Sequence, residues 1–502
     1  MKKRTQKMLS LLTVSAMALG TVCFASAEEA EWTNDDTAEI TILMSGDNTP
    51  NDDNLVLQEL EKQTNTKINM IYVPTNDLST KLNAMVASGE LPDIFRVKLQ
   101  DVEDLKDAGL LADMTDVFQA VAPNVLNETS EFLHKVAVNK DGIYMVPNAN
   151  ISYATNVCIR TDWLENLGLE MPTDLESFAE VMHAFTYDDP DGDGEDNTYG
   201  YSFSFENFTE GRIGRNILGA YGIPKGKNIE LEDGTITTWV KHPKFLEAMK
   251  YLKALIDDGV CEPDYMTIPT MSMFEKLWTG VSGCLEWECV GPTNNWMPGR
   301  YTEDPVPTFG FATLTGPDGE CGTPASYPNL TEGYVFSASC KNLEGAARIA
   351  NYLMTEEGND LLYLGVEGVM YNWIDKENGT FERIGEYADD ATHRANGGFC
   401  YWTLFTPKNA TEIRTLNAQT QEGVALASEN AIDWAYVTSN SEVYAECGAD
   451  MTQLINEMLA ELLVTDADDM QDVYDDYMAE WSEIGGADWE AEMTELWKEQ
   501  NQ

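Results

Sequence analysis

Three aspartates at alternate positions form the clearest chemical motif of the chain. Asp189, Asp191 and Asp193 lie in the stretch YDDPDGDGEDNTYG, with glycines between and after them. Alternation lets each carboxylate turn inward while glycine permits a tight bend, as in the first half of a D-x-D-x-D-G calcium loop. The carbonyl group of Glu195 and the side chain of Asn197 continue this series of oxygen ligands. The stretch predicts a structural Ca²⁺ site, with a solvated acidic loop as the alternative.

The motif departs from a complete EF-hand at its distal end. Position twelve of an EF-hand loop is a bidentate glutamate, whereas Gly200 stands there in this chain. The flanking sequence also lacks the second amphipathic helix of that motif. We therefore expect a calcium loop over residues 188–198 that is not part of an EF-hand.

Aromatic residues among glycines and small residues are candidates to bind a sugar. Sugars offer hydroxyl groups to planar polar side chains and C–H faces to aromatic rings. The stretches GCLEWECVGPTNNW, GVMYNW and GGFCYW supply the six candidates Trp287, Trp296, Tyr371, Trp373, Tyr401 and Trp402. For any single one of them, packing in a core is an equal alternative.

The residue types do not indicate catalysis. No G-x-S-x-G nucleophile motif is present, and four histidines argue against triads or histidine-based metal sites. A glycoside hydrolase needs two positioned carboxylates in a cleft, and 86 acidic residues leave such a pair open. We predict a protein that is not an enzyme, with a secreted glycan-active hydrolase as the alternative.

The first 27 residues have the pattern of a signal peptide. Four basic residues open the chain, an apolar run follows at residues 8–22, and the small-x-small sequence ASA occupies residues 25–27. We predict cleavage after residue 27 and a linker over residues 28–36. Lipid attachment at Cys23 is the alternative, which the large Val22 before it disfavours. The protein is thus expected to be extracellular or at the cell surface.

The remaining chain is strongly acidic. Without the four basic residues of the first segment, 27 of the 31 basic residues stand against 86 acidic ones, a net charge of −59. Such a charge repels nucleic acid and anionic lipid surfaces. It also disfavours a highly anionic ligand unless a local arginine or lysine overrides it.

Strands and helices alternate from residue 38 onward. The patterns predict strands at 39–46, 67–74 and 91–97 with helices at 54–64 and 77–90. This alternation implies parallel strands and an α/β lobe, in which ligands bind beyond the carboxyl ends of the strands. The loop over residues 45–53 lies at such an end, so Ser45 and Asn48 are candidate ligand residues. A plain polar turn is the alternative.

A second region begins near residue 150, and 502 residues are long for a single core. A helix is expected after Thr173, which forms a capping box with Glu176 three residues later. The apolar residues of this helix recur on one face, which is typical of a face packed in a core.

Five stretches in this order resemble one known family. They are VASGELPDIFRV, DGIYMVPNANISYATNVCIRTDWLENLGLEMPTDLESFAEV, DPDGDGEDNTYGYS, TEEGNDLLYLGVEGVMYNW and DDYMAEWSEIGGADWEAEM. The chain resembles the extracellular solute-binding proteins of family 1, the receptors of bacterial ABC importers. It is most similar to the large calcium-loop branch that includes alginate- and oligosaccharide-binding receptors. Residues 397–435 fit the family pattern less well.

The resemblance implies a periplasmic-binding-protein-like α/β fold with two discontinuous lobes. Lobe 1 would comprise residues 37–150 and 340–390, and lobe 2 residues 151–339 and 391–502. The chain would cross between the lobes at residues 142–156, 333–339 and 378–395. The resemblance further implies an oligosaccharide held in a cleft between the lobes and delivered to ABC permease transmembrane subunits. It implies a calcium loop without the distal glutamate, and we expect a monomer with no nucleic-acid partner.

Overall fold

The computed structural model describes most of the chain after residue 36. The described residues are 37–46, 49–74, 77–130, 133–148, 155–209, 212–290, 292–293, 300–325, 330, 332–405, 410–437, 439 and 441–501. The predicted signal peptide, the linker and Cys23 lie outside them. All the elements below belong to the compact unit Ala38–Gln502. Within this described part, no helix is both long and apolar enough to cross a membrane.

The first lobe is built on a five-stranded sheet with the order β2-β1-β3-β12-β4. Its strands are β1 Ala38–Ser45, β2 Thr66–Val73, β3 Ile94–Lys98, β4 Met145–Pro147 and β12 Glu332–Phe336. β1 pairs in parallel with β2 and β3, as the alternation of strands and helices predicts. β12 runs antiparallel to both β3 and β4.

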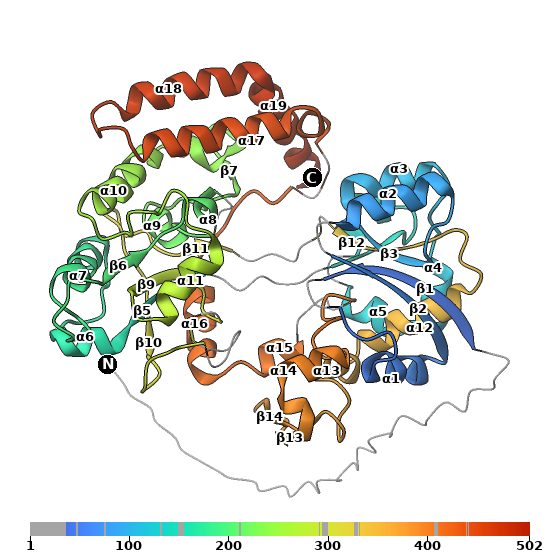
Figure 1. Cartoon of the computed structure of the whole chain (residues 1–502). Helices are drawn as coiled ribbons and strands as arrows, with labels where there is room; N and C mark the ends of the chain where they lie inside the picture. The colour runs from blue at the N-terminus through green and yellow to red at the C-terminus, as the bar shows by residue number, and fades with distance from the viewer. Residues whose placement is uncertain are drawn as a thin grey trace, which may run out of the picture. The chain divides into compact units, whose positions relative to one another are not determined.

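Helices cover both faces of this sheet (Figure 1). Successive side chains of β1 point to opposite faces, so Ile42 packs in one core cluster and Leu43 in another. The first cluster joins α1 Leu55–Thr64, α4 Thr115–Val121, α5 Pro123–Glu128 and α12 Leu343–Leu353 to the sheet. The second joins α2 Leu78–Ser88 and α3 Leu99–Asp107 to it. Polar groups can therefore gather only at the ends of the strands.

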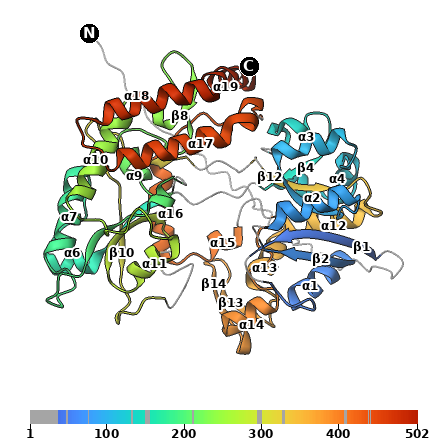
Figure 2. The same ribbon diagram turned by 45° about the horizontal axis from the view of Figure 1, so that its top comes forward.

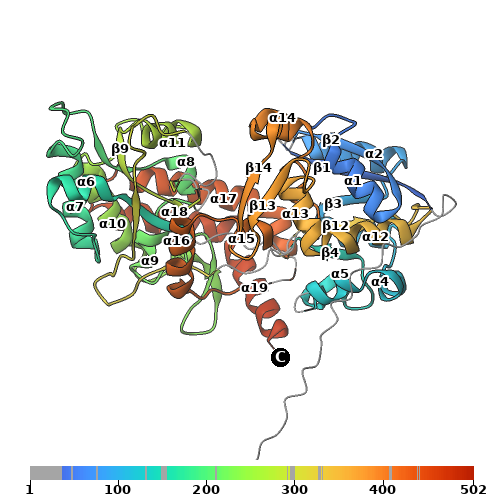
Figure 3. The same cartoon turned by 90° about the horizontal axis from the view of Figure 1, so that it is seen from below.

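A smaller group of elements continues the first lobe (Figure 3). It contains α13 Glu356–Leu364, the hairpin of β13 Tyr371–Asp375 and β14 Thr380–Arg383, α14 Asp390–Ala395 and α15 Ala410–Arg414. Backbone hydrogen bonds from Asn51 to Ala395 and from Val56 to Asn396 tie this group to the start of α1.

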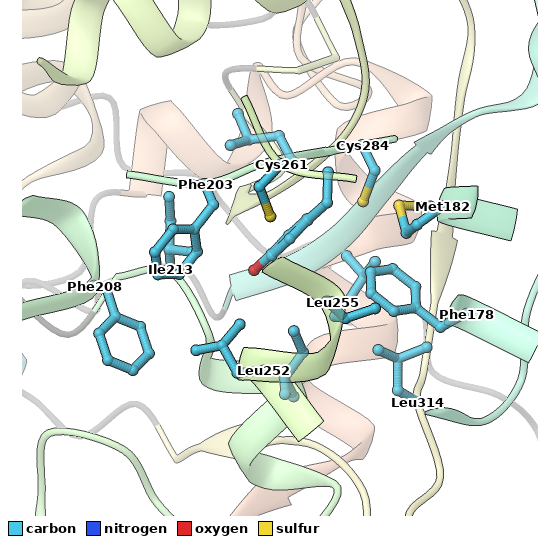
Figure 4. Close-up of a cluster of buried hydrophobic side chains, with 14 of the residues drawn as sticks. Phe178, Met182, Phe203, Phe208, Ile213, Leu252, Leu255, Cys261, Cys284 and Leu314 are labelled. Atoms are coloured by element: carbon cyan, nitrogen blue, oxygen red, sulfur yellow. The ribbon is translucent and has the colours of Figure 1, made fainter. Parts of the chain in front are cut away.

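The second lobe has a four-stranded sheet with the order β10-β5-β9-β6. The strands are β5 Thr155–Arg160, β6 Tyr199–Ser202, β9 Ser282–Glu288 and β10 Phe309–Ala312. β6 and β9 are parallel, whereas β5 is antiparallel to both β9 and β10. Figure 4 shows part of its core, where Phe178, Met182, Leu252, Leu255 and Cys284 gather.

Many helices pack around this second sheet. They are α6 Thr161–Leu167, α7 Leu175–Tyr187, α8 Phe205–Thr209, α9 Arg215–Gly219, α10 Phe245–Asp257, α11 Thr270–Trp278 and α16 Ala418–Glu429. The C-terminal helices are α17 Glu442–Leu462, α18 Met470–Trp481 and α19 Ala487–Gln500. Helices α17 and α18 run side by side (Figures 1 and 2). Short strand pairs join β7 Asn228–Glu230 to β8 Ile236–Thr238 and β11 Thr323–Pro324 to β15 Ala431–Ile432.

The chain passes between the two sheets at positions that differ in part from the expected ones. It leaves the first sheet after Pro147 and enters the second at Thr155, within the expected crossing at residues 142–156. Residues 333–339 were expected as the second crossing in lobe 2, but β12 pairs with β3 and β4 in the first sheet. The crossing thus lies before β12, because its backbone hydrogen bonds are made in lobe 1.

The third crossing also lies later than residues 378–395. Residues of α14 and α15 remain in the first lobe, where the Thr411 hydroxyl donates to Asp360 of α13 at 2.6 Å. The chain reaches the second lobe near Asn417, whose amide donates to the carbonyl group of Thr293 at 3.0 Å. The expected boundary between the lobes at residue 391 is therefore too early in the sequence, because the segment after it packs against α1 and α13 of the first lobe.

The N-terminus of α7 corrects the predicted capping box by one residue. Asp174 is the N-cap and accepts a hydrogen bond from the Ser177 amide at 2.8 Å, while the Ser177 hydroxyl pairs with the Asp174 amide. Thr173 precedes the helix, and its carbonyl group accepts from the Thr315 amide. Because an aspartate carboxylate also favours the positive end of the helix dipole, Asp174 replaces the predicted Thr173.

We expect Asp174→Ala to lower the melting temperature, whereas Thr173→Ala leaves it close to that of the wild type. Hydrogen bonds from Ser177 hold the pKa of Asp174 below its usual range. The cap therefore stabilises the fold above the ordinary aspartate pKa and is lost as the pH falls through the lowered one. Melting curves at neutral and acidic pH would test this, and an equal effect of the two substitutions would contradict the assignment.

Candidate functional site

The acidic loop joins the end of α7 to the start of β6. Its backbone amides turn toward the aspartates: the Gly194 amide donates to Asp189 at 3.1 Å, and the Glu195 amide donates to Asp193 at 2.7 Å. Glycines 192 and 194 take φ angles of 73° and 83°, in the left-handed region. Glycine adopts these angles without the penalty that other residues incur, so the loop can coil around its own carboxylates.

The loop brings three carboxylates together. One oxygen each from Asp189, Asp191 and Asp193 lies within 4.8 Å of the other two. Burial raises the pKa of Asp191, and the charges of Asp193 and Asp189 raise it further. Within the described residues, no lysine or arginine forms an ion pair with these three groups. Ionised oxygens at this spacing repel one another, so the arrangement is suited to a bound cation.

The other two predicted ligands, Glu195 and Asn197, lie in the loop but outside this three-carboxylate cluster. The side-chain amide of Asn197 donates to Asp193 at 3.0 Å. Gly200 is the second residue of β6, and a Cβ atom there would lie 2.2 Å from the carbonyl oxygen of Met182 in α7. Packing against α7 therefore leaves no room for the distal glutamate of an EF-hand at this position.

Trp287 packs in the core of the second lobe. It lies in β9 with 5% of its surface exposed, and its ring meets Phe274 edge-to-face at 5.0 Å between centroids. The guanidinium group of Arg212 lies 5.2 Å from the centroid of the Trp287 ring. A ring this buried offers little surface to a sugar, so most of its contacts stabilise the fold.

Tyr371 and Tyr401 are buried in the first lobe. The Tyr401 side chain is 2% exposed, and its hydroxyl accepts a hydrogen bond from Asn54, the N-cap of α1, at 2.8 Å. Tyr371 packs edge-to-face against Trp373 at 5.6 Å. Burial raises the pKa of both phenols, which keeps them neutral. Both residues thus connect elements of the first lobe.

Trp373 and Trp402 are brought into one aromatic cluster and remain partly exposed. The cluster also holds Tyr363, Phe381 and Phe399. Trp402 stacks on Phe399 with ring centroids 5.9 Å apart and an angle of 11° between the planes. Phe399 adopts a φ of 58°, which is uncommon for a bulky side chain and is typical of strained functional segments. Of the five predicted aromatic residues that the structure describes, these two are partly exposed, Trp373 in the strand β13 and Trp402 in a turn.

The remaining predicted residues are only partly covered by the structure. Ser45 ends β1 and is half-buried at the carboxyl end of the first sheet, as predicted. Asn48 and Trp296 lie outside the described residues.

A surface cavity of about 600 Å³ lies next to the aromatic cluster. Its wall includes the hairpin residue Phe381 together with Arg414. The planar amides of Asn378, Asn417 and Gln421 also line it. One aromatic ring with several planar polar groups is the combination that suits a sugar.

Cations and rings at the crossing segments were missed by the sequence analysis. Lys227 lies 4.6 Å from the ring centroid of Trp434, and the Trp434 indole donates to the carbonyl group of Ala325 at 2.9 Å. Arg215 donates to the Thr155 hydroxyl at 3.1 Å. The sequence feature that could have indicated this group is the set of four basic residues at positions 212, 215, 225 and 227, which lie close together in a very acidic chain.

The carboxylates near these cations, Glu286 and Glu288, belong to β9 of the second lobe. Glu286 is fully buried and accepts hydrogen bonds from the Asn216 amide at 2.9 Å and from the Tyr201 hydroxyl at 3.1 Å. Burial raises its pKa, and that of Glu288 as well. Glu286 is thus enclosed by protein groups on β6 and α9 rather than open to a substrate.

The chain is similar to proteins that bind solutes for import. Residues 46–259 match the family described as bacterial extracellular solute-binding protein. Lipoprotein LipO of Bacillus subtilis is 23% identical and aligns over 99% of both chains. The polygalacturonan/rhamnogalacturonan-binding protein YtcQ of the same organism is 25% identical over 88% of both. The fructooligosaccharide ABC transporter substrate-binding protein FusA of Streptococcus pneumoniae is 24% identical over 75% of this chain and 69% of its own.

Solved structures of other proteins have a fold similar to that of this chain. FusA in complex with kestose has a TM-score of 0.69 and 19% identity, covering 93% of this chain and 99% of its own. The alginate-binding protein AlgQ2 without calcium ion also has a TM-score of 0.69, with 18% identity over 94% and 100%.

The chain has the two-lobe fold of these solved structures, with an α/β sheet in each lobe. Residues 46–259 match the bacterial extracellular solute-binding protein family, which agrees with the resemblance of the motifs. YtcQ and FusA are named for binding rather than for catalysis, and neither supports the hydrolase alternative.

The buried and the partly exposed tryptophans should differ in their effect on stability. We expect Trp287→Ala to lower the free energy of unfolding by about 3–5 kcal/mol, the usual loss for a core tryptophan. Trp402→Ala should cost about 1 kcal/mol, because part of its ring already faces water. Denaturant unfolding of both variants measures the difference, and equal losses would contradict the contrast in burial.

Proposed function

We propose that this protein is the extracellular receptor of an ABC transporter, which captures an oligosaccharide and delivers it to the permease transmembrane subunits. The observation that carries the proposal is the pair of α/β lobes joined by crossing segments, with polar and aromatic residues at the strand ends and at the crossings. FusA and YtcQ, which align over most of this chain, are named for fructooligosaccharide and polygalacturonan/rhamnogalacturonan binding.

The proposed ligand-binding surface includes Trp373, Trp402 and Ser45 of the first lobe. Trp296 and Asn48, which the sequence also predicts, belong to the same proposal. Tyr371 packs against Trp373 beneath this surface, Tyr401 is buried in the core of the first lobe, and Trp287 is buried in the core of the second lobe. Ligand capture would then draw on residues of both lobes, and closure around the sugar would signal loading to the permease.

We further propose export by the signal peptide of residues 1–27 and a location outside the cell or at its surface. Release by cleavage is preferred over lipid attachment at Cys23. The net charge of −59 that follows cleavage supports a monomer without nucleic-acid partners, because such a charge repels both copies of the chain and nucleic acid.

The receptor should bind its sugar without changing it. A panel of oligosaccharides in a thermal-shift assay should reveal at least one that raises the melting temperature, because a ligand that binds only the native state stabilises it by RT ln(1 + [L]/Kd). That sugar should be recovered intact by mass spectrometry after long incubation. Shortened products that disappear when one acidic residue is replaced would contradict a binding role.

The acidic loop is proposed to hold one structural Ca²⁺ through Asp189, Asp191 and Asp193, completed by Glu195 and Asn197. The three clustered carboxylates, which have no basic partner among the residues that the structure describes, support this. One similar structure is described as a FusA EF-hand mutant, and that of AlgQ2 as lacking the calcium ion. The loop lies between α7 and β6, so a bound ion would stabilise the connection between these two elements.

Replacing Asp191 by asparagine should have opposite effects with and without calcium. Its raised pKa means that ionisation at neutral pH destabilises the metal-free fold, so Asp191→Asn should raise the melting temperature in EDTA. In calcium, the wild type should gain about 2.7 kcal/mol at one hundred times the dissociation constant, and the variant much less. Glu180→Gln, an exposed residue of α7, serves as the control for charge. An EDTA-insensitive wild type with no bound calcium would contradict the site.

A further inference from the structure

Two lysines between α9 and β7 lack carboxylate partners in a chain rich in carboxylates. Acidic residues outnumber basic ones by 86 to 31, and many lysines and arginines are paired, such as Lys241 with Glu490. Among the residues that the structure describes, no carboxylate lies within ion-pair distance of Lys225 or Lys227. Because a desolvated cation without an anion is costly, such a site needs an explanation.

Lys225 has a structural explanation. It is fully buried, its ammonium group donates to the carbonyl oxygen of Phe208 at 2.5 Å, and it lies 4.2 Å from the Phe208 ring centroid. Burial lowers its pKa well below the usual range, and the nearby charge of Arg215 adds to this. The residue fills the core beneath α8 and is not accessible to a ligand.

Lys227 differs because it is only half-buried. Its ammonium group lies over the ring of Trp434, and it has no hydrogen-bond acceptor among the described residues. Burial lowers its pKa to about 8, with a contribution from Arg215, so the side chain remains largely cationic at neutral pH. A partly exposed cation of this kind can still accept an anion from outside.

The Trp434 ring, over which the Lys227 ammonium group lies, is fixed by contacts with the crossing segments. The Trp434 indole donates to Ala325, and the ring packs against Tyr436 at 4.8 Å between centroids. The Tyr436 hydroxyl in turn accepts from the Leu330 amide at 3.0 Å. Residues 325 and 330 belong to the segment that leads into β12, so Lys227 is anchored where the chain passes between the two sheets.

A cavity of about 250 Å³ begins at Lys227. Its wall includes Trp239, Tyr444 and Trp481. Trp239 and Trp481 are buried, whereas Tyr444 is 50% exposed. The cavity therefore places Lys227 and the exposed ring of Tyr444 in one wall, which suits a ligand that carries negative charge on a ring with an apolar face.

We propose that Lys227 binds the carboxylate of an acidic sugar, so that the receptor takes an oligosaccharide containing uronic acid in preference to a neutral one. This inference rests on the proposed function as a sugar receptor. The local cation overrides the negative charge of the whole chain over a short range, since charges beyond about one Debye length of 8 Å are largely screened at physiological salt. Trp434 positions the ammonium group, and the exposed ring of Tyr444 offers a face for the sugar ring.

Calorimetry with matched sugars tests the proposal. The probes are trimers of galacturonate, glucuronate and mannuronate, each compared with its carboxyl-reduced counterpart, in which a hydroxymethyl group replaces every carboxylate. The wild type should bind at least one uronate trimer tenfold or more tightly than its reduced form, and high salt should weaken only the uronate binding. Lys227→Gln should remove this preference, whereas Lys227→Arg should keep it.

Lys250→Gln is the matched control, since Lys250 is exposed on α10 and its loss removes the same charge. Melting curves establish that each variant is folded, and the arginine variant keeps the test valid if the glutamine variant is not. A preference for the reduced trimers, or equal effects of Lys227→Gln and Lys250→Gln, would overturn the inference and leave the sugar receptor intact. Binding of no oligosaccharide, acidic or neutral, would overturn the proposed function and the inference together.

Discussion

Burial of each sheet by helices on both faces is the constraint on which the rest of this structure depends. In the first lobe, neighbouring residues of β1 enter different cores, so neither face of the sheet can carry polar chemistry. Polar and charged groups that could bind a ligand therefore lie at the ends of strands, in loops and in the crossing segments. Ser45 and Lys227 occupy such places, and the acidic loop lies between a helix and a strand for the same reason.

Charge acts against this background in two opposite ways. In the acidic loop, backbone amides donate hydrogen bonds to the aspartate carboxylates and keep them close together. Negative charge is therefore concentrated in a chain that already has a negative net charge. Near the crossings, Arg212 lies over Trp287 and Lys227 lies over Trp434, and the charges of Glu288 and Glu286 only partly offset the desolvation of the nearby Arg215. Both arrangements raise the energy of the empty protein, and a bound ion or ligand of opposite sign would relieve it.

The aromatic residues show how little local context reveals about burial. Six were chosen because glycine and small residues surround them, yet Trp287, Tyr371 and Tyr401 are buried, and Trp373 and Trp402 share one partly exposed cluster. Glycine next to a large ring can equally mark close packing: a Cβ atom at Gly283, four residues before Trp287, would collide with Trp163 and Phe185. A loop-like sequence is therefore compatible with either a core or a binding surface.

The sequence by itself determined what depends on near neighbours: the alternating strands and helices of the first lobe, their parallel pairing, and the spacing that gathers Asp189, Asp191 and Asp193. Periodicity and turn chemistry act over a few residues, so these features can be read along the chain. Tertiary structure alone decided that β12 completes the first sheet, that the chain returns to the second lobe near Asn417, and that Lys227 meets Trp434. These contacts join residues far apart in the sequence, such as Phe336 of β12 and Ile94 of β3, and their energies depend on burial and desolvation, which no local pattern records.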